Sequence, residues 1–470
     1  MGNKRYSLGI DIGTTSVKVC IYDVDSNEVL AKQSKDTQAN VPSDLGSEGN
    51  KQHVPKIISA MHSCVSRLPK ELLKQIKVIG VCGQMHGVML WSNEQGKFCW
   101  ERTEVGASGF KFEIDSTKVS NLYTWQDTRC EPKFLESLPV AESHVKIHTG
   151  FGCATLFWFA KNRPEKLQKY NCSGSVQDFA VALLCDMEKP VMSSQIASSW
   201  GYFNSTTNSW NTSLLEKAGF PVHLLPKVVT PREVVGKLPV SWFGIPAGTP
   251  VGAALGDFQC SVLATINNPN EAALNISTSA QIAYLMEDSF QPDPHPVAPP
   301  LTYFPYFDNK YLSVGASLNG GNVLATFVKM LQQWSLDLGF SVPQSKVWDK
   351  LGELGVKNGS ESTLQIIPTL LGERHLPTQN ASVLNLDPGN LSLGQVFRAL
   401  CRSIIDNLHS MISREQLQAS NIVKIVGSGS ALTRNKVLQT ELQKLYQMPV
   451  DFISGRGACV GAALAHSSVA

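Results

Sequence analysis

The sequence lacks the excess of charge, cysteine or hydrophobicity that marks a nucleic-acid-binding, disulfide-rich or membrane protein. Its 41 Lys and Arg residues nearly balance 39 Asp and Glu residues, and a net charge of +2 gives no electrostatic reason to bind nucleic acid or an acidic membrane. The 11 cysteines form no CxxC pair and no framework spacing, which favours a reducing compartment. No apolar run reaches membrane-spanning length, and the N-terminal residues show no long apolar stretch of the kind that secretory leaders contain. We therefore expect a globular protein of the cytoplasm.

What the sequence does contain, at its start, is a hydroxyl-rich turn in the stretch LGIDIGTTSVKVCIYD, residues 8–23. Apolar residues alternate with period two on both sides of the turn, which predicts a β-hairpin. The turn Gly13–Ser16 offers backbone amides and hydroxyls between Asp11 and Lys18, a combination that can hold a phosphate. It is neither a Walker A loop nor a Rossmann loop, because a strand rather than a helix follows it. Small polar residues also suit a plain turn, so both interpretations stay open.

The order of predicted strands and helices indicates an α/β protein. A third strand is expected at residues 28–32, an amphipathic helix at 52–67 and a buried strand at 76–82. Strands that alternate with helices favour the α/β class. The length of 470 residues is enough for about two or three domains.

A second stretch, EAALNISTSAQIAYLM at residues 271–286, resembles the opening hairpin. Its turn, Ile276–Ser279, falls where Ile12–Thr15 falls in the first hairpin, and apolar strands flank both turns. The match predicts two related halves, each beginning with a hydroxyl-rich turn.

Asp257 follows a predicted buried strand at residues 250–255. Open α/β sheets bind ligands at the carboxyl ends of their strands, where this carboxylate could act as a general base. Aspartate is also a common helix N-cap, and its position alone does not separate the two roles.

Two polar clusters follow in the first half. Gln84, Met85 and His86 come directly after the strand at 76–82, where His86 could be a proton shuttle or a substrate donor, or only a structural histidine. Residues 125–129, Trp-Gln-Asp-Thr-Arg, combine an aromatic ring with an acid and a base. Asp127 in this cluster could accept hydrogen bonds from sugar hydroxyls while Trp125 covers an apolar sugar face, or the acid and base could form a plain ion pair.

Glycine-rich turns precede two predicted helices in the second half, at residues 323–334 and 434–446, and the second turn lies between strands expected at 422–426 and 450–453. Amides at a helix start bind anions well, although each turn could equally be only a tight connection. His375 has no partner at metal-ligand spacing, so we expect it to be structural. The residues of the two turns are Gly320, Gly321 and Asn322, and then Gly427, Ser428, Gly429 and Ser430.

Taken together, these motifs resemble those of the FGGY carbohydrate kinases, members of the actin, hexokinase and chaperone ATPase superfamily. The resemblance covers nearly the whole chain and keeps the order of the motifs. Within the family it is strongest to the branch that phosphorylates sedoheptulose. The stretches that carry it are GQMHGVMLW, TWQDTRC, TGFGCAT, SWGYFN, GFPVHLLP, SLNGGNVLATF and LLGERHLP. Two positions depart from the usual pattern, Ser277 and Ser428, where many relatives have glycine.

The resemblance implies a fold of two actin-like, or ribonuclease H-like, ATPase domains with a cleft between them. The first domain, residues 1–257, would bind the sugar and carry the first phosphate hairpin, and the second, residues 258–470, would bind the nucleotide. The reaction would move the γ-phosphoryl group of ATP to O7 of sedoheptulose and feed the pentose phosphate pathway. ATP and Mg²⁺ are the implied cofactors, and the protein would be a monomer or a homodimer without nucleic-acid or membrane partners.

The same resemblance implies a role for each motif residue. Asp257 would be the general base, and Asp11 and Asp257 would hold Mg²⁺ through water. The β- and γ-phosphates would contact Gly13, Thr14, Thr15, Ser16, Lys18 and, from the second hairpin, Thr278. The nucleotide would also contact Gly320, Gly321, Asn322, Gly427, Gly429 and Ser430. The sugar would contact Gln84, Met85, His86, Trp125, Asp127 and Asp257.

Two rival functions stay open at this point. The first is a xylulose or ribulose kinase of the same family, which a panel of ketose substrates would distinguish. The second is a non-catalytic ATP-binding module of the superfamily, chaperone-like or filament-forming. Such a module has no reason to keep Asp257 and the two sugar motifs, which favours the kinase.

Overall fold

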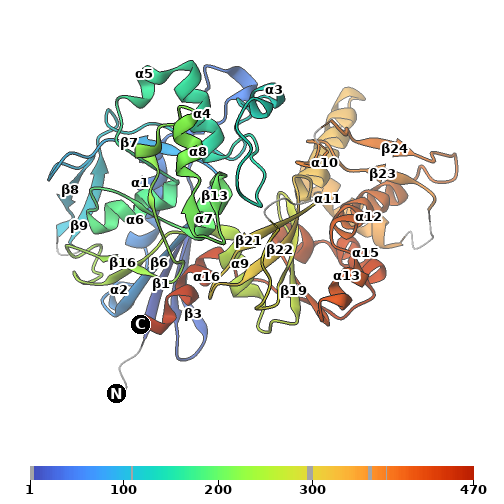
Figure 1. Ribbon diagram of the computed structural model, residues 1–470. Coiled ribbons are helices and arrows are strands. Elements are labelled where there is room, and N and C mark those ends of the chain that lie inside the picture. Colours follow the sequence, from blue (N-terminus) through green and yellow to red (C-terminus); the bar gives the residue numbers. More distant parts are fainter. Residues whose placement is uncertain (1–4, 107–108, 294–299, 358–361, 377, 470) are drawn as a thin grey trace.

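The computed structural model describes residues 5–106, 109–293, 300–357, 362–376 and 378–469. Two mixed β-sheets, each flanked by helices, form two lobes that lie side by side (Figure 1). The first lobe is built on the sheet with strand order β16-β17-β6-β1-β2-β3, and the second on the sheet β21-β22-β20-β19-β25-β26. No helix in the described ranges has the length and hydropathy needed to cross a membrane.

The first sheet begins with the expected hairpin. Its strands β1 (Tyr6–Ile12) and β2 (Ser16–Asp23) pair antiparallel, and β6 (Ile76–Gly83) lies parallel to β1. Every residue of β1 is buried, because side chains on one of its faces enter the main core with helix α1 (Val54–Ser66) and its other face meets the last helix of the chain. The remaining strands are β3 (Glu28–Asp36), β16 (Val234–Lys237), β17 (Pro250–Gly252) and β18 (Leu255–Gly256).

The second sheet repeats this pairing pattern. Strands β19 (Glu271–Ile276) and β20 (Ala280–Leu285) form an antiparallel hairpin, and β25 (Lys424–Ser428) lies parallel to β19 as β6 lies parallel to β1. The sheet is completed by β21 (Leu301–Pro305), β22 (Tyr311–Ser317) and β26 (Val450–Phe452). Its core is formed with the helices α10 (Gly321–Asp337), α11 (Gln344–Lys357), α12 (Leu393–Met411), α14 (Ser430–Arg434) and α15 (Lys436–Tyr446).

Two short helices lie between the lobes, α9 (Asp257–Thr265) and α16 (Ala458–Ala465) (Figure 1). Glycine lets α16 approach its neighbours closely. A Cβ atom on Gly9 of β1 would lie 1.8 Å from the carbonyl oxygen of Cys459, and one on Gly461 would lie 1.8 Å from that of Cys260 in α9. The end of the chain therefore returns to pack against the sheet of the first lobe.

The elements differ from the sequence predictions mainly at their ends. The third strand continues to Asp36 rather than ending at residue 32. The strand predicted at 250–255 is divided into β17 and β18, because Ala253 leaves the ladder and donates to the carbonyl of Glu233. The helix predicted at 434–446 begins instead after Asn435, whose side chain caps the amides of Val437 and Leu438.

The first lobe carries a further layer of helices and strands on the side of the sugar motifs. Its core joins Met85 and Leu90 to aromatic side chains such as Phe157 and Trp200. The elements around it include α4 (Gly152–Asn162), α7 (Ser194–Trp200) and the strand pair β7 (Met89–Trp91) with β11 (Cys172–Gly174), whereas helix α6 (Val176–Cys185) belongs to the main core of the first sheet.

Candidate active site

A cavity of about 730 Å³ lies between the lobes, and both hydroxyl-rich turns face it. The first turn contributes Gly13 to Ser16, and the second contributes Ser277 to Ser279. Of the residues predicted for the site, the cavity wall includes Asp11, Gly13, Thr14, Thr15, Ser16, Lys18, Gln84, Met85, His86, Trp125, Asp257, Thr278 and Gly429. The predicted residues that lie off the wall are Asp127, Gly320, Gly321, Asn322, Gly427 and Ser430.

Two carboxylates, Asp11 and Asp257, line this cavity. Asp11 is 5% exposed, and its Oδ1 is buried without a hydrogen-bond partner in the described part of the chain. Burial raises the pKa of Asp11 to about 6, while Lys18, whose Nζ lies 3.9 Å from Oδ2, acts to lower it. Burial, and then the charge of Asp11, raise the pKa of Asp257 to about 7. A carboxyl group that titrates near neutrality is suited to accept a proton.

The backbone directs Asp257 into the cavity. Strand β18 ends at Gly256, which is the N-cap of α9, so Asp257 is the first helical residue rather than the cap. Its Oδ1 accepts a hydrogen bond of 2.8 Å from the amide of Phe258. The side chain of Gln195 holds Gly256 from the other side, because its Oε1 accepts from the Gly256 amide at 3.2 Å. The junction of strand and helix thus fixes the carboxylate.

Thr14 connects the first turn to residues of the predicted sugar motifs. Its hydroxyl accepts from Nε1 of Trp125 at 2.9 Å and donates to Oε1 of Gln84 at 3.3 Å. The side chain of Gln52 supports the same group, since its Nε2 donates to the carbonyl of Thr14 and its Oε1 accepts from Gln84. Prediction from sequence missed Gln52, which gives no local signal.

His86 is held as a neutral ring with one free acceptor. Burial, followed by the charge of Arg374, lowers its pKa to about 3. Nδ1 lies 2.8 Å from the carbonyl oxygen of Ser199, which can only accept, so Nδ1 carries the proton and Nε2 is the acceptor. The ring stacks on Phe151 with centroids 4.4 Å apart. This arrangement suits acceptance of a hydroxyl hydrogen, not the proton-shuttle role considered from the sequence.

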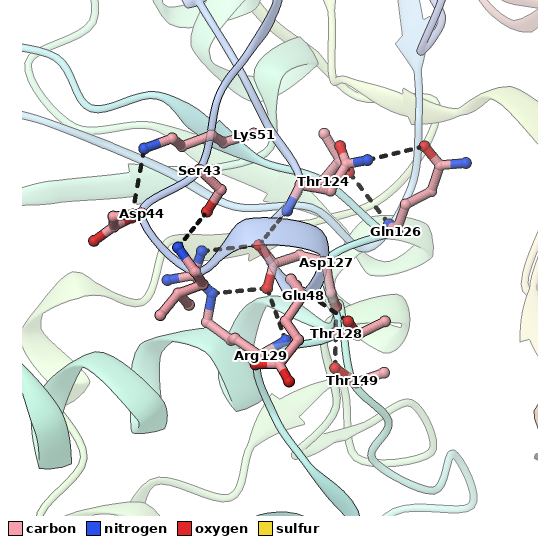
Figure 2. A network of polar contacts seen from close by, with 12 residues as sticks. Ser43, Asp44, Glu48, Lys51, Thr124, Gln126, Asp127, Thr128, Arg129 and Thr149 are labelled. Carbon is pink, nitrogen blue, oxygen red and sulfur yellow. Dashed lines mark hydrogen bonds and ion pairs between the residues drawn. The ribbon is translucent and has the colours of Figure 1, made fainter.

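The carboxylate of Asp127 is not part of the cavity wall, contrary to the sugar contact that the resemblance implies. It is fully buried and accepts two hydrogen bonds, of 2.7 and 2.8 Å, from the guanidinium of Arg129 (Figure 2). It also accepts from the backbone amide of Asn50 at 2.9 Å. The guanidinium of Arg129 lies over the ring of Tyr123. Asp127 therefore fixes the loop that carries Trp125, and its oxygens are already used by protein donors.

The glycine-rich turns support the second hairpin turn from behind. A Cβ atom on Gly321 would lie 2.2 Å from the carbonyl oxygen of Ser277, which also accepts from the Gly321 amide at 2.8 Å. Gly429 lines the cavity with a φ of +94°, and a Cβ there would lie 2.4 Å from the carbonyl oxygen of Ile276. Ser428, one of the departures from the family pattern, is buried and accepts from Asn275. These turns set the position of Thr278.

The cavity also includes residues that were not predicted, among them Arg374 and Phe304 from the second lobe and Arg456 from the segment before α16. Arg374 lies in the LLGERHLP stretch that contributes to the family resemblance. Nothing in its spacing marked it as a site residue.

The two carboxylates fit a magnesium ion that keeps much of its water shell. No group of three or more His, Cys, Asp or Glu residues in the described ranges could hold a metal ion alone. The partnerless Oδ1 of Asp11 and the carboxylate of Asp257 supply hard oxygen atoms to the same cavity. Mg²⁺ is usually bound by one or two carboxylates together with water and substrate phosphates.

Known proteins resemble this chain in sequence. The family model for the N-terminal domain of the FGGY family of carbohydrate kinases matches residues 6–99 and 103–264. Sedoheptulokinases of Mus musculus and Homo sapiens are each 48% identical to this chain, over 99% of it and 98% of their own length.

Solved structures extend the comparison to the whole fold. Xylulose kinase from Rhodospirillum rubrum has a TM-score of 0.79 and 18% identity, with 98% of this chain and 89% of that chain covered. Plasmodium falciparum glycerol kinase with ADP has a TM-score of 0.77 and 17% identity over the same shares. These likenesses confirm the predicted α/β fold of two actin-like, ribonuclease H-like domains.

Proposed function

The chain belongs to the FGGY family of carbohydrate kinases, and from this premise we propose that it phosphorylates sedoheptulose to sedoheptulose 7-phosphate. As a kinase of this family it transfers a phosphoryl group from ATP to a small sugar. The observation that carries the substrate assignment is the 48% identity to mouse and human sedoheptulokinases over 99% of the chain. A cytoplasmic location and a role in the pentose phosphate pathway belong to the same proposal.

Residues 1–257 are proposed as the sugar-binding domain and residues 258–470 as the nucleotide-binding domain. The two sheets and their similar hairpins support this division. The last helix, α16, is assigned to the second domain by sequence order but packs against β1 and α9. It therefore ties the second domain to the first at the base of the cleft.

Asp257 is proposed as the general base that accepts the proton of the sugar's terminal hydroxyl. Its pKa of about 7, raised by burial and by the charge of Asp11, supports this role. Phosphoryl transfer depends mostly on alignment and charge neutralisation, so the carboxylate also orients the hydroxyl for in-line attack. Thr14, Thr15, Ser16 and Lys18 of the first turn and Thr278 of the second would hold the β- and γ-phosphates from opposite sides of the cavity.

Asp11 and Asp257 are the residues proposed to hold Mg²⁺ through water. When bound, the ion would neutralise charge on the β- and γ-phosphate oxygens. The protein's own part is to keep Asp11 Oδ1 free of other donors and to direct both carboxylates into one cavity.

The sugar is proposed to contact Gln84, Met85, His86 and Trp125, which all line the cavity. Nε2 of His86 would accept from a hydroxyl, and the amide of Gln84 would donate or accept. Asp127 is left out of this set because Arg129 and the Asn50 amide use its oxygens.

The proposal is tested by measuring ADP production from ATP on a panel of five- and seven-carbon ketoses. Sedoheptulose is expected to give the highest kcat/KM. A higher value for xylulose or ribulose would replace the substrate assignment with a pentulose kinase. ADP production that no ketose stimulates, together with concentration-dependent polymerisation, would favour a non-catalytic ATP-binding module.

A further inference from the structure

The side chain of Arg374 lines the cavity from the second lobe. The turn that carries it is held in place by the preceding residue, Glu373. Glu373 and Leu376 exchange two backbone hydrogen bonds, so Arg374 lies at the tip of a tight turn. The carboxylate of Glu373 is 1% exposed and anchors the turn to the end of β22 and to α12. It accepts from the side chains of Ser317, Asn319 and Asn407 and from the amide of Leu318.

These bonds leave Glu373 unavailable as a close partner for Arg374. In the described part of the chain, no hydrogen-bond acceptor or carboxylate pairs with the guanidinium of Arg374. Burial lowers the pKa of Arg374 below the usual arginine value, although the charge of Glu373 acts to raise it. A guanidinium with five donors in a partly desolvated wall requires oxygen acceptors.

Arg374 shares the cavity wall with His86 of the first lobe, whose ring is neutral. Burial lowers the pKa of His86 and of His148, and the charge of Arg374 lowers both further. His148 packs edge-on against Phe151, the ring on which His86 stacks. Lys18, another cation of the cavity wall, acts instead on Asp11 and Asp257. The two cations therefore serve different parts of the cavity.

We propose that Arg374 is a substrate-binding residue, which donates hydrogen bonds from the second domain to oxygen atoms of the ketose opposite His86. This inference rests on the proposed sugar-kinase function and adds a sugar contact outside the first-domain motifs. Carbonyl and hydroxyl oxygens of a ketose can both accept from a guanidinium, and a hydroxyl can donate in turn to Nε2 of His86. The bound sugar would then contact both domains.

The test compares the wild type with R374Q, R374K and a matched control, H375Q. His375 is the next residue of the same turn and lies off the cavity wall. The KM for sedoheptulose is measured at saturating ATP, the KM for ATP at saturating sedoheptulose, and folding by thermal melting. A charged hydrogen-bond donor typically contributes enough affinity that R374Q should raise the sedoheptulose KM about 10- to 100-fold.

The KM for ATP should stay within about twofold in every variant, because Arg374 is assigned to the sugar. R374K should give an intermediate sedoheptulose KM, since lysine keeps the charge but loses the planar pair of donors. H375Q should match the wild type. If R374Q does not fold, R374K carries the test, with an expected rise of several-fold. An unchanged sedoheptulose KM, or an equal rise in the KM for ATP, would overturn the assignment.

Calorimetric binding of sedoheptulose separates this inference from the proposed function. A wild type that binds the ketose but does not phosphorylate it would overturn only the kinase assignment. Equal affinity in the wild type and R374Q would overturn only the role of Arg374. A wild type that binds no ketose would overturn both.

Discussion

The indole nitrogen of Trp125 donates a hydrogen bond of 2.9 Å to the hydroxyl of Thr14. This bond joins a residue of the proposed phosphate turn to a residue of the proposed sugar wall. The same hydroxyl donates to Gln84, so one threonine couples both ends of the cavity. A substitution at Thr14 should therefore affect the sugar as well as the nucleotide.

We expect T14V to lower kcat/KM for sedoheptulose by about 10- to 100-fold, because valine keeps the shape but leaves the half-buried Trp125 donor without its partner. T14S keeps the hydroxyl and should stay within several-fold of the wild type. A double-mutant cycle with W125F measures the coupling, since both single variants remove the hydrogen bond between Trp125 and Thr14. Strictly additive losses in the cycle would contradict the coupling.

Asp127 is expected to be needed for stability rather than for direct sugar contact. D127N breaks a fully buried ion pair with Arg129 and should lower the free energy of unfolding by about 3–5 kcal/mol. The control is D115N, at an exposed pair with Lys118, which should change that free energy by less than about 1 kcal/mol. Chemical denaturation measures both. A stable D127N protein with a strongly raised sedoheptulose KM would instead make Asp127 a sugar ligand.

Helices α16 and α9 lie so close together that we expect no room for an added side chain between them. In G461A the new Cβ would lie 1.8 Å from the Cys260 carbonyl oxygen, so we expect a loss of about 1–3 kcal/mol in the free energy of unfolding. Turnover should fall as well, because α9 begins at Asp257. The matched control is G352A in helix α11, where a Cβ meets open space and alanine should stabilise by about 0.5–1 kcal/mol. Similar melting temperatures for the two variants would contradict this packing.

His62 is expected to make the protein less stable in acid. Burial among aromatic side chains lowers its pKa from 6.5 to about 4. The unfolded chain therefore binds more protons between these values, so stability rises with pH in this window and is lost as pH falls through it. Across the whole window, His62 lowers the free energy of unfolding by about 3 kcal/mol.

The variant H62M should flatten the dependence of unfolding free energy on pH between about 6.5 and 4. The exposed His223, changed as H223Q, serves as the control. An unaltered slope in H62M would show that His62 is not a source of the acid sensitivity.

Local patterns in the sequence were enough to predict the two hairpins and the residues that their turns direct into the cavity. Alternating apolar residues fix which face of β1 enters the main core, and the turn Gly13–Ser16 at the end of this hairpin lines the cavity. Strand β18 ends at Gly256, so the next residue, Asp257, lies at a strand end, where the sequence pattern placed it. These are consequences of near neighbours in the chain, which a single sequence contains.

The residues whose roles could not be predicted, or that were missed, depend largely on contacts between distant segments of the chain. The sequence left Asp127 either as a sugar contact or as an ion-pair partner of Arg129; the structure shows the ion pair, and the amide of Asn50, far earlier in the chain, also donates to Asp127. The turn of Arg374 is fixed by Glu373 through donors from residues 317–319 and 407. No periodicity or motif spacing encodes such pairings.

The most direct test of the account is the turnover of D257N, measured as sedoheptulose-dependent ADP production. D115N is the control, and binding of ATP and sedoheptulose is measured separately. If Asp257 is the base, kcat should fall at least about 1,000-fold, or about 4 kcal/mol in activation free energy, while both ligands still bind. Turnover of D257N close to that of the wild type would contradict the central role of Asp257.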